Sequence, residues 1–159
     1  MLCRPHPQKG IDFFLSSIAT IESLGLPVRF LLAGPTLDQE GYYFNLAKSY
    51  GLNSIKFEGF YSDPRKFYSK LDAFALTSLY GEAFPNVLAE AMLMGLPCIT
   101  SNVGDAATIV SKYGWVFEPD DQAGFCSRVE ESSLLFQREK SWRQLTQQCR
   151  KSIAERFDI

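Results

Sequence analysis

The sequence predicts an α/β fold: a Rossmann-like, doubly wound parallel sheet with helices on both faces. Short apolar runs, rich in β-branched and aromatic residues, alternate along the chain with longer stretches of helical period. Such alternation is typical of parallel strands joined by right-handed helical crossovers. The chain has 159 residues, 46% of them hydrophobic and 21% charged, which suits one domain with one core.

Each predicted strand is short, contains β-branched or aromatic residues, and is bounded by Gly, Pro, Ser or Asp. In chain order the predicted strands are residues 28–33, 55–58, 73–77, 98–100 and 114–117. A strand should also precede the first predicted helix, and only residues 1–3 are available for it. We therefore expect the chain to begin inside a strand, as a fragment of a larger protein would.

The predicted helices are recognised by their apolar spacing and by the residues at their ends. Residues 11–24 carry apolar side chains three and four positions apart, and Gly25 follows as a stop. Asp63 and Pro64 form a helix start, as does Pro85. The predicted helices are residues 11–24, 40–50, 64–71, 85–94, and 121–157 as one helix or two with a break near Lys140-Ser141.

Charge and composition exclude several classes of protein. Sixteen Lys and Arg against 18 Asp and Glu leave a net charge of −2, so the total charge does not support nucleic-acid binding. No apolar run approaches the roughly 18 residues that a membrane span needs, and residues 1–10 lack the apolar region of a secretory signal. Cys3, Cys98, Cys126 and Cys149 form no CxxC pair, so we expect reduced thiols rather than a disulfide framework, with Cys98 and Cys126 buried.

Several common catalytic motifs are absent from the sequence. It contains no G-x-x-x-x-G-K-[ST] phosphate loop, no G-x-G-x-x-G, no H-E-x-x-H and no G-x-S-x-G. A Ser-His-Asp or Cys-His site would have to use His6, the single histidine, which lies among prolines in a predicted loop. The simpler interpretation is that His6 is a solvated loop residue.

The stretch from Gly81 to Pro97 is the most informative part of the chain. Glu82 lies in the loop after a predicted strand, and Glu90 lies about a turn and a half inside the next predicted helix. Helical side chains tilt towards the N-terminus, so Glu90 can reach the carboxyl ends of the strands, where such sheets bind ligands. Two carboxylates there could hold a sugar diol; the alternative is a pair of ordinary surface acids. An anion could bind the N–H groups expected to be free at Asn86, Val87 and Leu88.

Arg4 and Lys9 form a second candidate group. One follows the first predicted strand and the other precedes the first predicted helix, so both can point into the same crevice. The planar guanidinium and the point charge of the ammonium suit a diphosphate. Solvated surface charges are the alternative interpretation.

In this order, the motifs resemble the carboxyl-terminal, donor-binding half of family-4 glycosyltransferases with the GT-B architecture. That family shows G-R-x-x-x-x-K-G, a glycine-containing turn after the next strand, an F-x-G turn, and then E-x-F/G followed by E-A-M-x-x-G-x-P. The resemblance covers nearly the whole chain. The matching residues are Arg4 with Lys9-Gly10, Ala33-Gly34-Pro35, Phe57-Glu58-Gly59, Glu82-Ala83-Phe84-Pro85-Asn86-Val87-Leu88-Ala89-Glu90-Ala91-Met92, Gly95 and Pro97.

The resemblance implies retaining transfer of a sugar from a UDP- or GDP-sugar to a hydroxyl acceptor, without a metal or other cofactor, in polysaccharide or glycoconjugate synthesis. Arg4 and Lys9 would neutralise the diphosphate as the glycosyl bond breaks. Glu82 would approach the donor hexose, and Glu90 would bind ribose hydroxyls. Glu82, Arg4 and Lys9 would be catalytic, and the further donor-binding residues would be Gly34, Phe60, Phe84, Asn86, Val87 and Leu88. Phe60 and Tyr61 lie where the base would rest, or else are core or rim aromatics.

The resemblance also implies a domain organisation and a cellular location. Residues 1–159 would form a nucleotide-sugar-binding domain, and an absent N-terminal domain would bind the acceptor and complete the cleft, so we expect the chain alone to be inactive. The expected location is cytoplasmic, with peripheral contact to the inner membrane face only through the absent half. Cys3, Thr36 and Ala83 stand where the family often has glycine. The alternative is a non-catalytic nucleotide-binding or interaction module of Rossmann-like fold.

Overall fold

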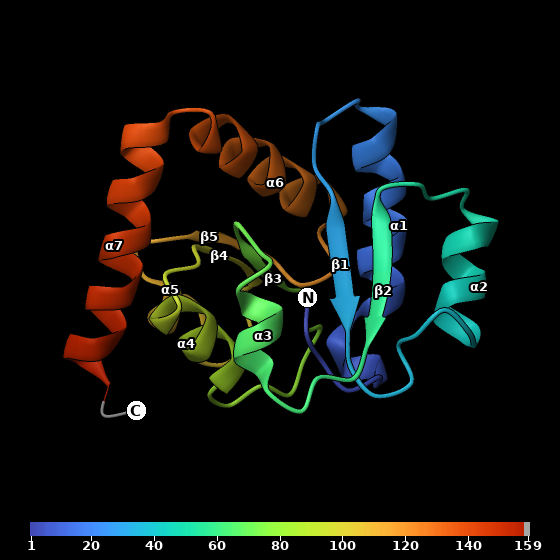
Figure 1. Ribbon diagram of the computed structural model, residues 1–159, viewed down its shortest axis with the longest axis horizontal. Coiled ribbons are helices and arrows are strands. Elements are labelled where there is room, and N and C mark those ends of the chain that lie inside the picture. The colour runs from blue at the N-terminus through green and yellow to red at the C-terminus, as the bar shows by residue number, and fades with distance from the viewer. Residues whose placement is uncertain (158–159) are drawn as a thin grey trace.

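The computed structural model describes residues 1–157 and confirms the α/β fold (Figure 1). All five predicted strands are present: β1 Phe30–Ala33, β2 Ile55–Gly59, β3 Phe74–Leu76, β4 Cys98–Ser101 and β5 Trp115–Phe117. The helices are the 3₁₀ turn η1 Pro7–Lys9, then α1 Ile11–Ser23, α2 Tyr42–Ser49, α3 Pro64–Tyr68, α4 Asn86–Leu93, α5 Ala106–Val110, α6 Gln122–Phe136 and α7 Glu139–Arg156.

All strand pairs are parallel, as predicted. β1 pairs with β2, and β4 lies between β3 and β5. The start of the chain lies beside β1: Leu2 forms a parallel bridge with Ala33, and the Cys3 N–H donates to the Ala33 carbonyl at 3.0 Å. The first predicted strand is therefore a single bridge rather than a full ladder. Within each sheet the strands run in one direction, so their carboxyl ends share an edge. The start of the chain links the carboxyl ends of β1 and β3, because the Leu79 N–H donates to the Gln8 carbonyl at 2.7 Å.

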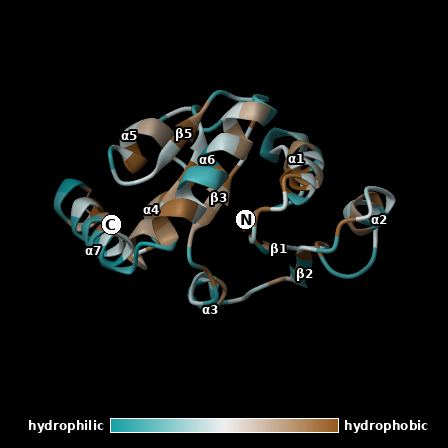
Figure 2. Ribbon diagram, turned by 90° about the horizontal axis from the view of Figure 1, so that it is seen from above, coloured by the Kyte–Doolittle hydropathy of each residue, from teal (hydrophilic) through white to brown (hydrophobic). Residues whose placement is uncertain are grey.

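Hydrophobic side chains of the strands alternate between two clusters. Leu32 and Ile99 pack with residues of α1, α2 and α6, whereas Ala33 and Cys98 pack with residues of α3, α4, α5 and α7. Successive residues of a strand point to opposite faces, so these clusters lie on the two faces of the strands. Figure 2 shows α1 and α3 on opposite sides of the strands. The doubly wound arrangement is confirmed.

The structure differs from the prediction mainly at the ends of elements. The break in the C-terminal helical region lies at Gln137 and Arg138 rather than at Lys140-Ser141. Just after this break in the sequence, Trp142 of α7 stacks on Trp115 of β5, with 6.4 Å between ring centroids. This aromatic packing helps to position the turn, and the sequence pattern does not reveal it. The short helix α5 was not predicted, because five residues are too few for a clear period. No helix among residues 1–157 is both long and apolar enough to cross a membrane.

Candidate functional site

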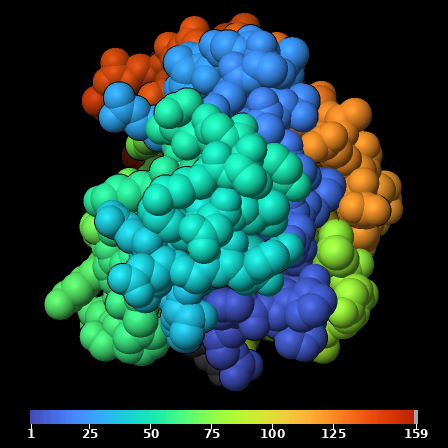
Figure 3. Space-filling model, turned by 90° about the vertical axis from the view of Figure 1, so that its right-hand side faces the viewer, coloured from blue at the N-terminus to red at the C-terminus, as the bar shows by residue number. Residues whose placement is uncertain are grey.

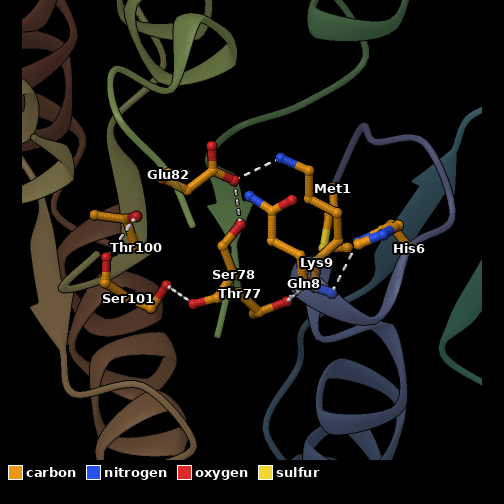
Figure 4. Close-up of polar contacts among 9 residues, drawn as sticks. All are labelled: Met1, His6, Gln8, Lys9, Thr77, Ser78, Glu82, Thr100 and Ser101. Atoms are coloured by element: carbon orange, nitrogen blue, oxygen red, sulfur yellow. Dashed lines mark hydrogen bonds and ion pairs between the residues drawn. The ribbon is translucent and has the colours of Figure 1, made fainter. Parts of the chain in front are cut away.

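An ion pair at the carboxyl ends of the strands joins the start of the chain to the loop that follows β3. The Lys9 ammonium, on η1, lies 2.5 Å from Oε1 of Glu82, in the loop between β3 and α4 (Figure 4). Only 21% of the Lys9 side chain and 10% of the Glu82 side chain are exposed. Figure 3 shows the start of the chain, in dark blue, at the lower edge of the molecule between the segments that follow β1 and β3. The pair thus sits where parallel sheets bind ligands.

Two buried serines support Glu82 from below. The Ser78 hydroxyl donates to Glu82 Oε1 at 2.6 Å, so the same oxygen accepts from both Lys9 and Ser78. The Ser101 hydroxyl, at the end of β4, donates to the Ser78 carbonyl at 2.5 Å. Ser78 and Ser101 are both fully buried. Figure 4 shows the second oxygen of Glu82, Oε2, pointing away from both of its neighbours.

Lys9 is held in place through its backbone. The buried Thr77 hydroxyl lies 3.1 Å from the Lys9 carbonyl oxygen and 3.3 Å from that of Gly10. Gly10 has a left-handed backbone with φ of 62°, and a Cβ atom there would collide with the Thr77 carbonyl oxygen. A side chain at this position would therefore push η1 away from β3. Consecutive residues after β3, Thr77 and Ser78, thus hold the cation and the carboxylate respectively.

Glu90 belongs to a different group of side chains. Its Oε2 accepts from the Tyr68 hydroxyl of α3 at 2.9 Å, and the Tyr68 ring is buried. Burial, followed by the hydrogen bond to Glu90, raises the pKa of Tyr68 well above its usual value. Tyr68 therefore acts as a neutral donor to the carboxylate. Among residues 1–157, no ion pair or hydrogen bond joins Glu90 to Lys9 or Glu82.

The remaining predicted residues lie around these two groups without contacting both. Arg4 is exposed and forms no ion pair within the described chain. Gly34 approaches the Cys3 carbonyl so closely that a Cβ would collide with it. Phe84 is half-buried and packs edge-to-face on Phe157 at 5.4 Å.

The start of α4 offers fewer donors than the sequence predicts. The Leu88 N–H donates to the Pro85 carbonyl at 2.9 Å, so it is not free for an anion. Hydrogen bonds within residues 1–157 leave the N–H groups of Asn86 and Val87 unused. The prediction of three free N–H groups is therefore wrong for Leu88, because a 3₁₀-type bond closes the first turn.

The two aromatic residues after β2 have different environments. The Tyr61 side chain is held by two contacts: its hydroxyl donates to Glu58 at 2.5 Å, and its ring packs edge-to-face on Phe67. Phe60 is 70% exposed. Hydrogen bonds from Lys56, Lys70 and Tyr61 lower the pKa of Glu58 to about 2. Phe60 is therefore the more open of the two to a ligand, since Tyr61 is half-buried.

The side chains in other candidate roles are structural. The Nδ1 of His6 accepts from the Gln8 N–H at 3.2 Å and caps η1. All four cysteines are free and buried, and burial raises the pKa of Cys3 to about 11 and that of Cys149 to about 12. Among residues 1–157, no three His, Cys, Asp or Glu side chains gather as a set of metal ligands.

Comparison with known proteins places this geometry in a family. The profile of a family described as "Glycosyl transferases group 1" matches residues 1–133. The chain is 31% identical over 129 residues to the capsular polysaccharide biosynthesis glycosyltransferase CapM of Staphylococcus aureus, covering 77% of this chain and 33% of CapM.

Solved structures share the fold. The crystal structure of Anabaena Alr3699/HepE in complex with UDP-glucose has a TM-score of 0.81 and 25% identity, covering 99% of this chain and 43% of that one. A glycosyltransferase from Rickettsia africae has a TM-score of 0.82 at 19% identity, covering 98% of this chain and 42% of that one. The chain thus spans less than half the length of each of these relatives.

Proposed function

The chain belongs to the group 1 glycosyltransferases, and from that membership we propose that it is the carboxyl-terminal, donor-binding domain of a retaining, family-4 enzyme of GT-B type. The donor in this proposal is a UDP- or GDP-sugar, and the product is a polysaccharide or glycoconjugate. CapM is a capsular polysaccharide enzyme by name, and HepE has been solved with UDP-glucose, which supports both parts. Because the relatives are longer, we propose that a second domain supplies the acceptor side of the cleft.

The observation that carries the proposal is the Lys9–Glu82 pair at the carboxyl edge of the strands. Lys9 has three N–H donors, and a single ion pair leaves the others for diphosphate oxygens. Its charge would stabilise the leaving diphosphate as the glycosyl bond breaks, so no metal is needed for that step. Arg4 is exposed and free to add a second positive charge when a donor binds.

The two carboxylates take separate parts in this proposal. Glu82 Oε2 would accept a hydroxyl of the donor hexose, and Glu90 would accept the ribose hydroxyls from α4. The N–H groups of Asn86 and Val87 would receive phosphate oxygens at the start of that helix. The exposed ring of Phe60 would lie against the base.

The test is titration of the chain with UDP and with GDP, in which binding is measured by amide NMR chemical-shift changes and by calorimetry. We expect one of them to bind, and Lys9→Met to weaken that binding about tenfold, because a charged hydrogen bond contributes ~1.5–3 kcal/mol. Lys151→Met is the matched control, since Lys151 lies in an exposed pair with Glu155 on α7. Binding of neither nucleotide, or equal binding by both variants, would contradict the proposal.

A further inference from the structure

We propose that Ser78 is a positioning residue for Glu82, with Ser101 fixing Ser78, so that Oε2 of Glu82 is the oxygen offered to a donor-sugar hydroxyl. This inference rests on the proposed function and assigns the source of its sugar recognition. The sequence pattern places both serines directly after predicted strands but does not assign them this role.

The hydrogen bonds of Glu82 are unequal. Oε1 accepts from Lys9 at 2.5 Å and from Ser78 at 2.6 Å, whereas no residue from 1 to 157 donates to Oε2. A carboxylate bound by Lys9 alone could pivot, because the ammonium is a point charge at the end of a flexible chain. The second bond, from Ser78, fixes the plane of the carboxylate. With Oε1 bonded twice, Oε2 is the oxygen left to accept from a ligand.

The position of Ser78 is in turn determined by the sheet. Its carbonyl accepts from the Ser101 hydroxyl at 2.5 Å, which ties the residue after β3 to the end of β4. Neither serine has access to water, so each hydroxyl depends on its partner in the protein. β3 and β4 are themselves paired in register, from Phe74 with Cys98 to Leu76 with Thr100. The orientation of Glu82 is thus transmitted from the rigid sheet through two buried hydroxyls.

This arrangement separates two kinds of recognition. Lys9 is held through its backbone by Thr77, and this hydrogen bond does not depend on Ser78. Loss of the Ser78 hydroxyl should therefore release the Glu82 carboxylate and leave the cation in place. Binding of a nucleoside diphosphate should be preserved, and the additional affinity gained from the attached sugar should fall.

The experiment compares UDP with UDP-glucose, or GDP with GDP-mannose if the chain prefers guanine, by NMR titration of the whole chain. The quantity measured is the dissociation constant of the diphosphate divided by that of the sugar nucleotide. A higher ratio means a larger contribution of the sugar to binding. We expect Ser78→Ala to reduce this ratio about tenfold, the effect of one hydrogen bond to a charged group. Ser101→Ala should act in the same direction, and Ser78→Thr, which keeps the hydroxyl, should restore the ratio.

The matched control is Ser17→Ala. Ser17 is also fully buried, and its hydroxyl donates to the Phe13 carbonyl at 2.7 Å inside α1, away from Glu82. It should leave both dissociation constants unchanged. An unchanged ratio in Ser78→Ala, with normal binding of the diphosphate, would overturn this inference and leave the proposed function standing. Failure of the unaltered chain to bind any of the four nucleotides would overturn both.

Discussion

Gly104 offers a direct test of how closely the Glu82 loop is packed. Gly104 has φ of 57°, and the N–H of the next residue, Asp105, donates to the Ala83 carbonyl at 2.8 Å. In Gly104→Ala the new Cβ would lie 2.6 Å from the Ala83 oxygen and closer still to that of Glu82. Real Cβ atoms keep at least 3.0 Å from such neighbours, so the loop must move by about 0.4 Å, the difference between 3.0 Å and 2.6 Å, and by more at Glu82.

The magnitude follows from two separable costs. A left-handed alanine costs about 1 kcal/mol or somewhat more, and the displaced loop adds roughly 1–3 kcal/mol, as in other overpacked sites. Gly51→Ala is the matched control: Gly51 has φ of 69° and nothing within 4 Å of its Cβ position. It should show the first cost alone. The difference in free energy of unfolding between the two variants therefore isolates the collision with the loop.

The assay is urea denaturation of both variants, with nucleotide titration under native conditions. We expect Gly104→Ala to be less stable than Gly51→Ala by about 1–3 kcal/mol. It should also lose at least about tenfold in affinity for the nucleotide sugar, because small displacements of positioned groups have large effects. Equal stability of the two variants would refute the reasoning about loop packing. Normal sugar binding by a destabilised Gly104→Ala would refute the placement of Glu82 in the site.

Two further predictions concern carboxylates outside this loop. The folded-state pKa of Glu58, about 2, lies below its usual value of 4.5, so its stabilising effect should be complete above about pH 5 and lost as the pH falls towards 2. Glu58→Gln should reduce the acid sensitivity by on the order of 1 kcal/mol, since its lysine partners are largely exposed and screened; identical acid unfolding curves would contradict this. Tyr68→Phe should cost about 1 kcal/mol and weaken nucleotide binding through Glu90. The control Tyr42→Phe removes an exposed bond to Asp12 and should change neither; equal effects would refute the role of Tyr68.

The fold was predictable because its signals are local and repeated. The apolar run at residues 30–33 and the glycine after it define a strand and its end, and Asp63 followed by Pro64 defines a helix start, with the Asp63 side chain accepting from the Arg65 N–H at 3.1 Å. The break between α6 and α7 was displaced by two or three residues because Trp142 is placed by Trp115, 27 positions away along the chain. Helix prediction from apolar spacing uses only residues that are close in the sequence, so it cannot detect a contact of this range.

The candidate site was predictable in part, for a similar reason. The residue types around Lys9 and Glu82 could be recognised from their motifs, but their pairing spans 73 positions and appears only when β3 places its following loop beside η1. Ser78 and Ser101 carried the signal of hydroxyl residues directly after predicted strands. Serine is common at such places, so their burial and their partners had to come from the structure.

Glu82 and Glu90 lie eight positions apart but accept hydrogen bonds from different donors, Lys9 and Tyr68. This difference explains how one short stretch can contact both the sugar and the nucleoside of a donor. Glu82 is paired with a charged ammonium, so the pair is nearly neutral and does not repel an incoming diphosphate. Glu90 is held by the neutral hydroxyl of Tyr68, and no cation among residues 1–157 forms an ion pair with it. A free carboxylate beside the phosphates would oppose binding, whereas one directed at ribose hydroxyls gains from its charge. On the proposed function, this division of donors requires Lys9 near the diphosphate and Glu90 on the nucleoside side.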